Sequence, residues 1–307
     1  MTTSLTRRAG YRSPAYAESL ATAVRCVELP ASGGRLLVRT IGSSGHLDAC
    51  GTYPVFSCDE PARLAVDVEE LDDELVSVTL VADPLTPWDT ASLARAFPVM
   101  RPLAAHYVID IDRGGLQPSS HPRRKLRRAA AQNTEIRVEA DPVAMAAQWT
   151  GLYGVLIEQV GITGFRRFSG EIFERMLAVP GTVLFTAWDG QTLIGADWYF
   201  EDGDRIYAHL SAYSQAGYAR SVSYPLMDAA LRHFAARGGR VLDLGGVPLV
   251  AGAGPGLGYF KQGWATRMLP CWLCGRVVDP DRYAELAKDS GPASAAYFPR
   301  YRFGEFS

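Results

Sequence analysis

No stretch of this 307-residue sequence is both long and apolar enough to cross a bilayer, which takes about 20 such residues in a row. The first residues, MTTSLTRRAGYRS, carry basic side chains without an apolar run behind them, so no secretory signal is visible. We therefore expect no membrane insertion and a location in the cytoplasm. Hydrophobic residues at 48% and charged residues at 21% are typical of a globular protein with a substantial core.

Cysteine is scarce. The five cysteines, an odd number, lie near the two ends of a large chain, at positions 26, 50, 58, 271 and 274. This distribution argues against a disulfide framework and for reduced thiols. Cys271 and Cys274 have CxxC spacing, but they lie in a strand-like segment, and no second CxxC or HxxxH partner follows. We expect both to be core thiols, and we expect no metal site.

Motifs of covalent catalysis are also lacking. The sequence contains no G-x-S-x-G elbow and no other motif that marks a nucleophilic side chain. A mechanism with a covalent enzyme intermediate is therefore not indicated.

Neither sign of charge is in large excess, because the net charge is −2, but the charges are unevenly distributed. Residues 1–120 carry ten Lys and Arg against fifteen Asp and Glu, whereas the remainder carries twenty-one against eighteen. The positive excess is concentrated in the segment HPRRKLRRAAAQ, in which five of the six residues 123–128 are basic: Arg123, Arg124, Lys125, Arg127 and Arg128. On a helix these charges stack and repel one another, and contacts with the phosphates of a polyanion would remove that cost. The alternative is a solvated face balanced by the acidic N-terminal part.

Alternation, helical spacing and turn residues together predict a mixed α/β (α+β) chain. Strands are expected at 35–42, 75–83, 106–115, 135–139, 182–188, 192–200, 205–213 and 240–244. Helices are expected at 14–25, 89–97, 141–159, 170–178 and 222–237, with a further helix that begins after Ser119 or Ser120. Asp189-Gly190 between two alternating strands is a strong hairpin signal. A linker rich in Gly, Pro and Ser at 114–122 places a domain boundary near residue 117, which gives domains 1–117 and 118–307.

A glycine-rich stretch follows the last of these strands. Residues 248–258 are expected to form a loop, since glycine permits positive φ angles and close approach of the backbone to a ligand. The loop delivers Tyr259, Phe260, Lys261 and Trp264 within six positions. One cation among large aromatic side chains is a candidate site of chemistry. The alternative is a surface loop whose aromatic side chains attach it to the core.

Five motifs in residues 107–264 resemble the Gcn5-related N-acetyltransferase (GNAT) superfamily, and within it the FemABX and BioF2-like branch. They are YVIDI at 107–111, HPRRKLRRA at 121–129, YSQAGYARSVSYPLMDAAL at 213–231, DLGG at 243–246 and GLGYFKQGW at 256–264. The resemblance implies two tandem GNAT-like domains, each a mixed, mostly antiparallel sheet flanked by helices. The first hundred residues resemble the family only in the order of their elements.

Members of this branch move an aminoacyl group from aminoacyl-tRNA to an amine, so the resemblance implies this donor, an amide product and no cofactor. Known acceptors are peptidoglycan precursors, small peptides and natural-product intermediates. The resemblance also implies that Lys261 lies beside the reacting carbonyl, where a fixed cation stabilises the oxyanion of the tetrahedral intermediate. Asp197, Asp243 and solvent are the candidates to accept the proton of the amine. No sustained heptads indicate the coiled-coil arm of some peptidoglycan-type relatives, which favours a small-molecule acceptor.

The expected site residues form two groups. The substrate group is Tyr213, Asp197, Asp243, Gly245, Tyr259, Phe260 and Trp264. The tRNA group is Arg123, Arg124, Lys125, Arg127, Arg128, Tyr218, Arg220 and Ser223.

Two other functions remain open. An acetyl-CoA-dependent GNAT enzyme needs an Arg/Gln-x-x-Gly-x-Gly/Ala turn for the pyrophosphate. The comparable segment begins with Gln215 and contains Gly217, but Tyr218 and Arg220 break the pattern. An acyl-CoA-dependent N-acyltransferase is therefore the first alternative, and a non-catalytic RNA-binding protein of the same fold is the second.

Overall fold

The computed structural model describes residues 8–21, 24–71, 74–111, 118–161, 167–247, 255–291 and 296–304. The chain divides into two compact units. Unit 1 comprises Met1–Gly10 and Ala105–Leu269, and unit 2 comprises Tyr11–Ala104 and Pro270–Ser307. Strands β5 (Val99–Asp110) and β11 (Arg267–Val277) contribute residues to both units.

These units do not coincide with the predicted domains 1–117 and 118–307. The C-terminal segment belongs to unit 2 because β11 pairs antiparallel with β4 (Leu75–Ala82). Composition identifies a linker-like segment, but long-range strand pairing decides which segments share one compact unit.

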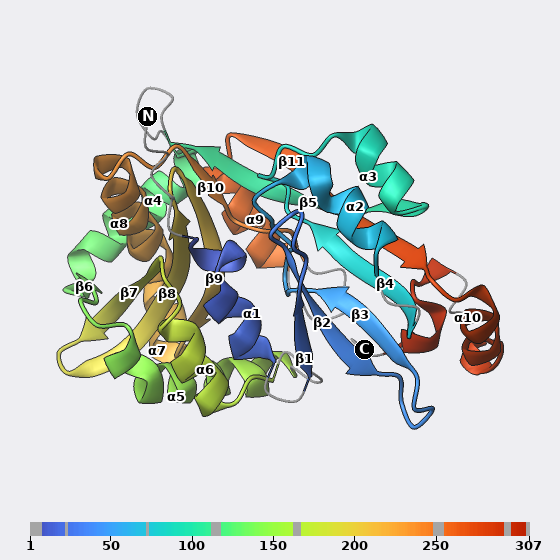
Figure 1. The fold of residues 1–307 in the computed structure, drawn as a ribbon. Helices are drawn as coiled ribbons and strands as arrows, with labels where there is room; N and C mark the ends of the chain where they lie inside the picture. Colours follow the sequence, from blue (N-terminus) through green and yellow to red (C-terminus); the bar gives the residue numbers. More distant parts are fainter. Residues whose placement is uncertain are drawn as a thin grey trace. The chain divides into compact units, whose positions relative to one another are not determined.

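Unit 1 contains a sheet with strand order β5-β10-β9-β8-β7-β6 (Figure 1). Besides β5, its strands are β6 (Glu135–Val138), β7 (Thr182–Asp189), β8 (Thr192–Asp202), β9 (Arg205–Tyr213) and β10 (Val241–Asp243). Its helices are α4 (Ser120–Ala129), α5 (Ala146–Val160), α6 (Gly170–Leu177), α7 (Gln215–Arg220), α8 (Ser223–Ala236) and α9 (Pro255–Trp264). Strands β9 and β10 pair in parallel, and the other neighbours pair antiparallel.

Strand β8 is buried on both faces. Tyr199 packs against Phe234 of α8 with ring centroids 5.4 Å apart, and Trp198 packs against Trp149 of α5 at the same separation. Because successive side chains of a strand point to opposite faces, α8 covers one face of the sheet and α5 covers the other. Every residue from Ile194 to Phe200 is consequently buried.

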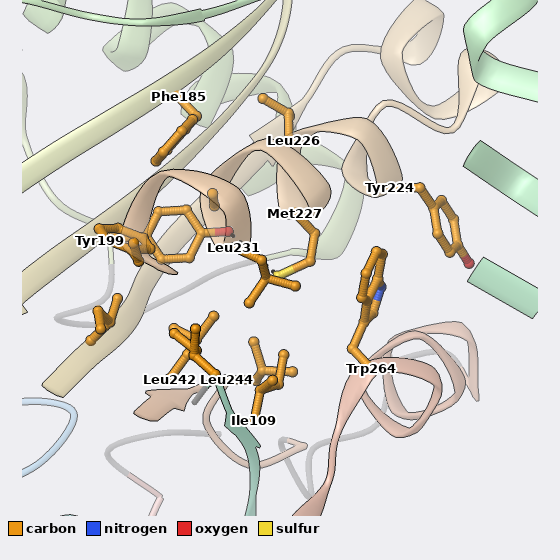
Figure 2. Close-up of a cluster of buried hydrophobic side chains, with 14 of the residues drawn as sticks. Ile109, Phe185, Tyr199, Tyr224, Leu226, Met227, Leu231, Leu242, Leu244 and Trp264 are labelled. Carbon is orange, nitrogen blue, oxygen red and sulfur yellow. Dashed lines mark hydrogen bonds between the residues drawn. The ribbon is translucent and has the colours of Figure 1, made fainter. Parts of the chain in front are cut away.

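The core of unit 1 lies between α8 and the strands beneath it. Figure 2 shows Met227 and Leu231 of α8 above Leu242 of β10 and Ile109 of β5. All four of these side chains are at most 3% exposed. This packing fixes the position of β10, from whose C-terminal end the DLGG turn emerges.

Unit 2 has strand order β1-β2-β3-β4-β11, in which β3 and β4 are parallel. Its remaining elements are β1 (Arg25–Glu28), β2 (Arg35–Thr40), β3 (Leu47–Gly51), α1 (Pro14–Leu20), α2 (Leu64–Glu69), α3 (Thr90–Ala96) and α10 (Pro280–Ala287). Cys271 and Cys274 of β11 are buried free thiols, as the sequence predicted. Burial raises the pKa of the Cys274 thiol to about 12.

The mixed, mostly antiparallel fold and the central hairpins are confirmed, whereas several local expectations are wrong. The helix expected at 14–25 ends at Leu20, and β1 begins at Arg25. Strand β5 begins at Val99 rather than at 106. Strand β3 and helices α2, α7 and α10 were not expected. Among the described residues, no helix is long and apolar enough to cross a membrane.

Residues 248–254 of the expected glycine loop lie outside the described residues, so only its later part can be compared with the structure. Residues 112–117, which include the start of the expected linker, also lie outside them. From Pro255 onward the loop prediction is wrong, since α9 begins there. Proline is well tolerated at the start of a helix, where its missing N–H has no helical partner to lose. The later turn of α9 packs closely on α4, where a Cβ at Gly263 would lie 2.9 Å from the Pro122 ring.

Candidate active site

Lys261 reaches from α9 to the turn that follows β10. Its Nζ donates a hydrogen bond to the carbonyl oxygen of Gly246 at 2.6 Å. The preceding Gly245 has φ +74°, a left-handed conformation that favours glycine. A Cβ at Gly245 would lie 3.5 Å from Lys261 Nζ. The two glycines of the DLGG motif thus form a backbone turn that holds the ammonium.

Asp243 fixes the same turn from inside. One carboxylate oxygen, Oδ1, accepts a hydrogen bond from the backbone N–H of Gly245 at 2.7 Å. The other, Oδ2, lies 2.8 Å from Nδ1 of His106 on β5. Asp243 and His106 are 4% and 8% exposed, so this pair is buried. A carboxylate with both oxygens engaged in a buried site holds its neighbours in one arrangement.

Burial and Asp243 act in opposite directions on Lys261. Burial, the larger effect, lowers the pKa of the Lys261 ammonium to about 8, while the negative charge of Asp243 raises it. Loss of hydration disfavours the charged form of a lysine, and a nearby carboxylate favours it. Lys261 is therefore a cation near neutral pH, in surroundings where its charge acts strongly on a neighbouring group.

The parallel ladder beside this turn is short. The last paired residues of β9 and β10 are Tyr207 and Asp243. Strand β9 nevertheless continues to Tyr213, paired with β8 on its other side. The turn with Lys261 follows directly on the residue where the β9–β10 ladder ends.

Asp197 of β8 lies on the extended part of this hairpin, opposite Ser211 of β9. Its carboxylate accepts hydrogen bonds from the hydroxyls of Tyr213 at 2.6 Å and Tyr199 at 3.4 Å. Burial raises the pKa of Asp197 to about 6, and these hydroxyls oppose that change. The ring of Tyr213 in turn contacts the half-exposed Tyr218 of α7, with centroids 5.4 Å apart.

The segment compared with a CoA-binding turn is largely explained by packing. A Cβ at Gly217 would lie 2.0 Å from the carbonyl oxygen of Ile194, so glycine is needed where α7 crosses β8. Arg220 forms an ion pair with Asp189 and donates to the carbonyl of Gln132. The guanidinium of Arg220, expected in the tRNA group, thus ties α7 to the turn between β7 and β8.

Helix α4 presents a cationic outer face. Arg123, Arg124, Arg127 and Arg128 are all exposed. Within the described ranges, no carboxylate pairs with any of these four arginines. An open hollow of about 540 Å³ along the same face is lined by Ser120, Arg123, Leu126 and Arg127. Such a face is a candidate surface for phosphates, and the assignment of these four arginines to tRNA stays a prediction.

Lys125 faces the other side of α4. Its Nζ donates to the hydroxyl of Ser221 at 3.2 Å and lies 5.9 Å from the centroid of the Tyr224 ring. Ser221 precedes Ser223, the first residue of α8, by two positions. Lys125 and Ser223 therefore belong to the junction between α4 and α8.

The aromatic residues of α9 separate into two environments. Trp264 is 5% exposed and lies in the core of unit 1 (Figure 2), and Phe260 packs against it with centroids 6.4 Å apart. Tyr259 is 55% exposed, and its ring meets that of His121 on α4 at 4.5 Å. Trp264 and Phe260 thus attach α9 to the core, as in the alternative stated above. Tyr259 instead belongs to the cationic face of α4.

Residues 120–261, which include α4, the β7–β9 hairpins, the DLGG turn and Lys261, match the family described as an acetyltransferase (GNAT) domain. This region is a GNAT domain. The superfamily resemblance inferred from the motifs is therefore confirmed. A search of curated protein sequences finds no match.

Solved structures similar to the chain include FemX, with 12% identity, coverage of 89% of this chain and 93% of FemX, and a TM-score of 0.67. The C-terminal domain of a protein described as a lysylphosphatidylglycerol synthetase from Agrobacterium fabrum matches with 13% identity, 88% coverage of both chains and a TM-score of 0.64. L-PGS from Bacillus licheniformis matches with 13% identity, coverage of 86% and 92%, and a TM-score of 0.54. At these identities the likeness shows a shared fold, which extends beyond the GNAT domain to most of the chain.

Two histidines beside the GNAT motifs were not expected to be part of the site. His106 immediately precedes YVIDI, and His121 opens HPRRKLRRA. The position of His106 beside one motif and of His121 at the start of another is the only sequence signal for them. No group of three or more His, Cys, Asp or Glu that could hold a metal ion occurs within the described ranges.

Proposed function

We propose that this protein transfers an aminoacyl group from aminoacyl-tRNA to the amine of a small molecule or a peptide. The amine nitrogen attacks the ester carbonyl, a C–N bond forms, and the C–O bond to the terminal ribose of the tRNA breaks. The ribose oxygen leaves and takes up the proton that the amine nitrogen loses. Both candidate carboxylates, Asp197 and Asp243, already accept hydrogen bonds within the protein, so we assign neither of them as the base.

Lys261 is the observation that carries the proposal. It is a half-buried cation, anchored to Gly246 at the end of β10 in a GNAT domain. In the tetrahedral intermediate the carbonyl oxygen becomes negative, and a fixed cation stabilises this charge more than the neutral ester. The lowered pKa also suits Lys261 to this role, because partial dehydration strengthens its interaction with a developing charge.

The donor is inferred from α4. The exposed arginines of that helix provide the phosphate contacts that a tRNA requires, and they belong to the same GNAT domain as Lys261. The fold shared with FemX and with lysylphosphatidylglycerol synthetase supports aminoacyl transfer as the reaction class. Phosphate contacts of this kind release counterions, so binding of tRNA is expected to weaken steeply with salt.

A second candidate is an acyl-CoA-dependent N-acyltransferase. The description of the matching family as an acetyltransferase domain favours it. The packing role of Gly217 and the ion pair of Arg220 weaken it, because both features account for the segment without a pyrophosphate.

The test uses total tRNA charged with isotope-labelled amino acids and a mixture of small amine metabolites and peptides. Labelled amides are detected by mass spectrometry. Lys261→Met, which keeps most of the side-chain volume but removes the charge, is expected to lower the rate of amide formation by about 10² with little change in tRNA binding. Lys288→Met is the matched control. Lys288 is an exposed lysine directly after α10, and it lies in unit 2, whereas Lys261 lies in unit 1.

Three outcomes would contradict the proposal. A fully active Lys261→Met variant would exclude the role of Lys261. Products formed from acyl-CoA but not from charged tRNA would favour the second candidate. Binding of RNA through α4 without any amide product, and without effect of Lys261→Met, would favour a non-catalytic RNA-binding protein.

A further inference from the structure

Three aromatic rings and two cations meet where α4, α8 and α9 come together. His121 lies at the centre, with its ring 4.5 Å from Tyr259 of α9 and 5.6 Å from Tyr224 of α8. Arg124 and Lys125 flank this group: the guanidinium of Arg124 contacts His121, and Lys125 lies over the Tyr224 ring. We call these five residues the His121 platform.

Hydrogen bonds hold the ring of His121 in one orientation. Its Nδ1 lies 3.3 Å from Nη2 of Arg124, and its Nε2 lies 2.7 Å from the hydroxyl of Tyr224. A guanidinium only donates, so Nδ1 accepts and the Nε2–H of a neutral ring donates to Tyr224. Partial burial, followed by the charges of Arg124 and Lys125, lowers the pKa of His121, which keeps the ring neutral. His121 is thus a fixed aromatic surface and not an additional charge.

Tyr259 is the accessible part of the platform. Its side chain is 55% exposed, whereas Tyr224 is only 8% exposed. An exposed ring next to unneutralised arginines fits an occupant that has both a flat face and a negative charge. A nucleotide has both, but in a duplex its base face is covered by neighbouring base pairs. The occupant that fits is therefore an unpaired nucleotide.

We propose that the His121 platform binds an unpaired nucleotide of the donor RNA, with the base stacked on Tyr259 and the phosphate facing Arg124. The inference rests on the proposed function, because it assumes that α4 binds RNA. It assigns Tyr259 to the donor rather than to the acceptor pocket expected from the sequence. Residues 259 and 261 are two positions apart on a helix, hence about 200° apart around its axis. We therefore expect Tyr259 and Lys261 to contact different nucleotides. The ester that meets Lys261 is on the 3′-terminal nucleotide, so the nucleotide on Tyr259 is one that precedes it.

The experiment compares two hairpin RNAs of identical stem, one with four unpaired nucleotides at its 3′ end and one with a blunt end. Affinities are measured by fluorescence anisotropy at fixed salt for the full-length protein. Stacking of one base predicts that the tailed RNA binds about tenfold more tightly to the unmodified protein. Tyr259→Ala is expected to abolish this preference, and Tyr259→Phe to retain it. His121→Gln, which keeps a donor for Tyr224 but lacks the ring, is expected to reduce the preference.

Arg127→Ala is the matched control, an exposed arginine of the same cationic face about one turn from Arg124 that makes no contact with the His121 ring. This variant is expected to lower the affinity for both RNAs by the same factor, since it removes a phosphate contact but no stacking surface. Because Tyr259 is mostly exposed, its replacement leaves the core packing of Trp264 and Phe260 intact. Retention of the tail preference in Tyr259→Ala would overturn the inference while leaving the proposed function standing. Two results would overturn both the inference and the proposed function. One is failure of the unmodified protein to bind either RNA, and the other is Tyr259-dependent binding of CoA in place of RNA.

Discussion

The negative charge of Asp243 favours the protonated form of Lys261. Replacing Asp243 therefore gives a test that does not require a known substrate. Burial lowers the pKa of Lys261 and the carboxylate of Asp243 raises it, with a resulting value of about 8. Asp243→Asn removes the negative charge but keeps an oxygen able to accept from the Gly245 N–H. The burial of Lys261 remains. The pKa of Lys261 is therefore expected to fall.

The expected fall in the pKa of Lys261 follows from the usual effect of a nearby opposite charge. An opposite charge in the immediate surroundings shifts a pKa by about 1 to 3 units, and we take the lower figure of about one unit. A lysine with a pKa of about 8 is about 90% protonated at pH 7, and one with a pKa of about 7 is about half protonated. If the protonated form stabilises the oxyanion, activity falls about twofold at pH 7 and about fivefold at pH 8.

The assay measures the reactivity of the amine itself. The sequence contains only three lysines, Lys125, Lys261 and Lys288, so peptides from each are readily distinguished by mass spectrometry. Brief labelling with an amine-reactive reagent over a pH series gives a midpoint for each lysine. In Asp243→Asn the midpoint of Lys261 is expected about one unit lower, with Lys288 unchanged. Asp228→Asn, which removes a partly exposed carboxylate paired with Arg232 on α8, is the matched control.

An unchanged midpoint for Lys261 in Asp243→Asn would refute the reasoning. So would an upward shift, since Asp243 is the one group among the described residues that raises the pKa of Lys261. An equal shift in Lys125 and Lys261 would indicate a general change of structure instead of a loss of one charge.

Two further predictions concern buried groups of unit 1. His106→Leu removes the donor to the buried Oδ2 of Asp243, so the free energy of unfolding is expected to fall by about 1 to 3 kcal/mol. His106→Asn, whose amide can replace the Nδ1–H donor, is expected to restore most of this stability, and equal losses in both variants in denaturant titrations would contradict this. Asp197 has a pKa raised from 3.8 to about 6, so the folded state holds the proton more tightly than the unfolded state. Its contribution to stability is complete below about pH 4 and is lost as the pH rises through about 6, a change of about 3 kcal/mol. Denaturant titrations of the unmodified protein and of Asp197→Asn measure this change. The free energy of unfolding of the unmodified protein, relative to that of the variant, is expected to fall by about this amount between pH 4 and pH 7. A difference between the two proteins that does not vary with pH would contradict the prediction.

The parts of the fold that the sequence predicted are those in which local pattern and burial agree. Strands β7, β8 and β9 alternate or are continuously apolar, and a turn with Asp189-Gly190 joins the first two. Helix α4 was located from its basic run and from Ser119 or Ser120 at its start. In each case the signal lies within about ten residues, the range over which periodicity is informative.

Strand β5 and helix α9 show where local pattern fails. Pro102 lies inside β5 and removes a backbone donor, and local pattern predicted the strand only from 106. Gly256, Gly258 and Gly263 lower the intrinsic helix propensity of α9, but tertiary packing compensates. Gly263 lets α4 approach closely, and Trp264 is buried in the core of unit 1. These contacts come from segments far away in the sequence.

The site depends on the same long-range contacts. Lys261 was identified from its motif, but its partner Gly246 is 15 residues away, and Asp243 meets His106 across 137 residues. The antiparallel register of β5 and β10, which sets Asp243 opposite Val108, is what places His106 level with Gly245. A shift of this register by one residue would turn His106 to the other face of the sheet. The core packing of Leu242 and Ile109 therefore determines the surroundings of Lys261, since it fixes the register that joins the carboxylate, the turn and the ammonium.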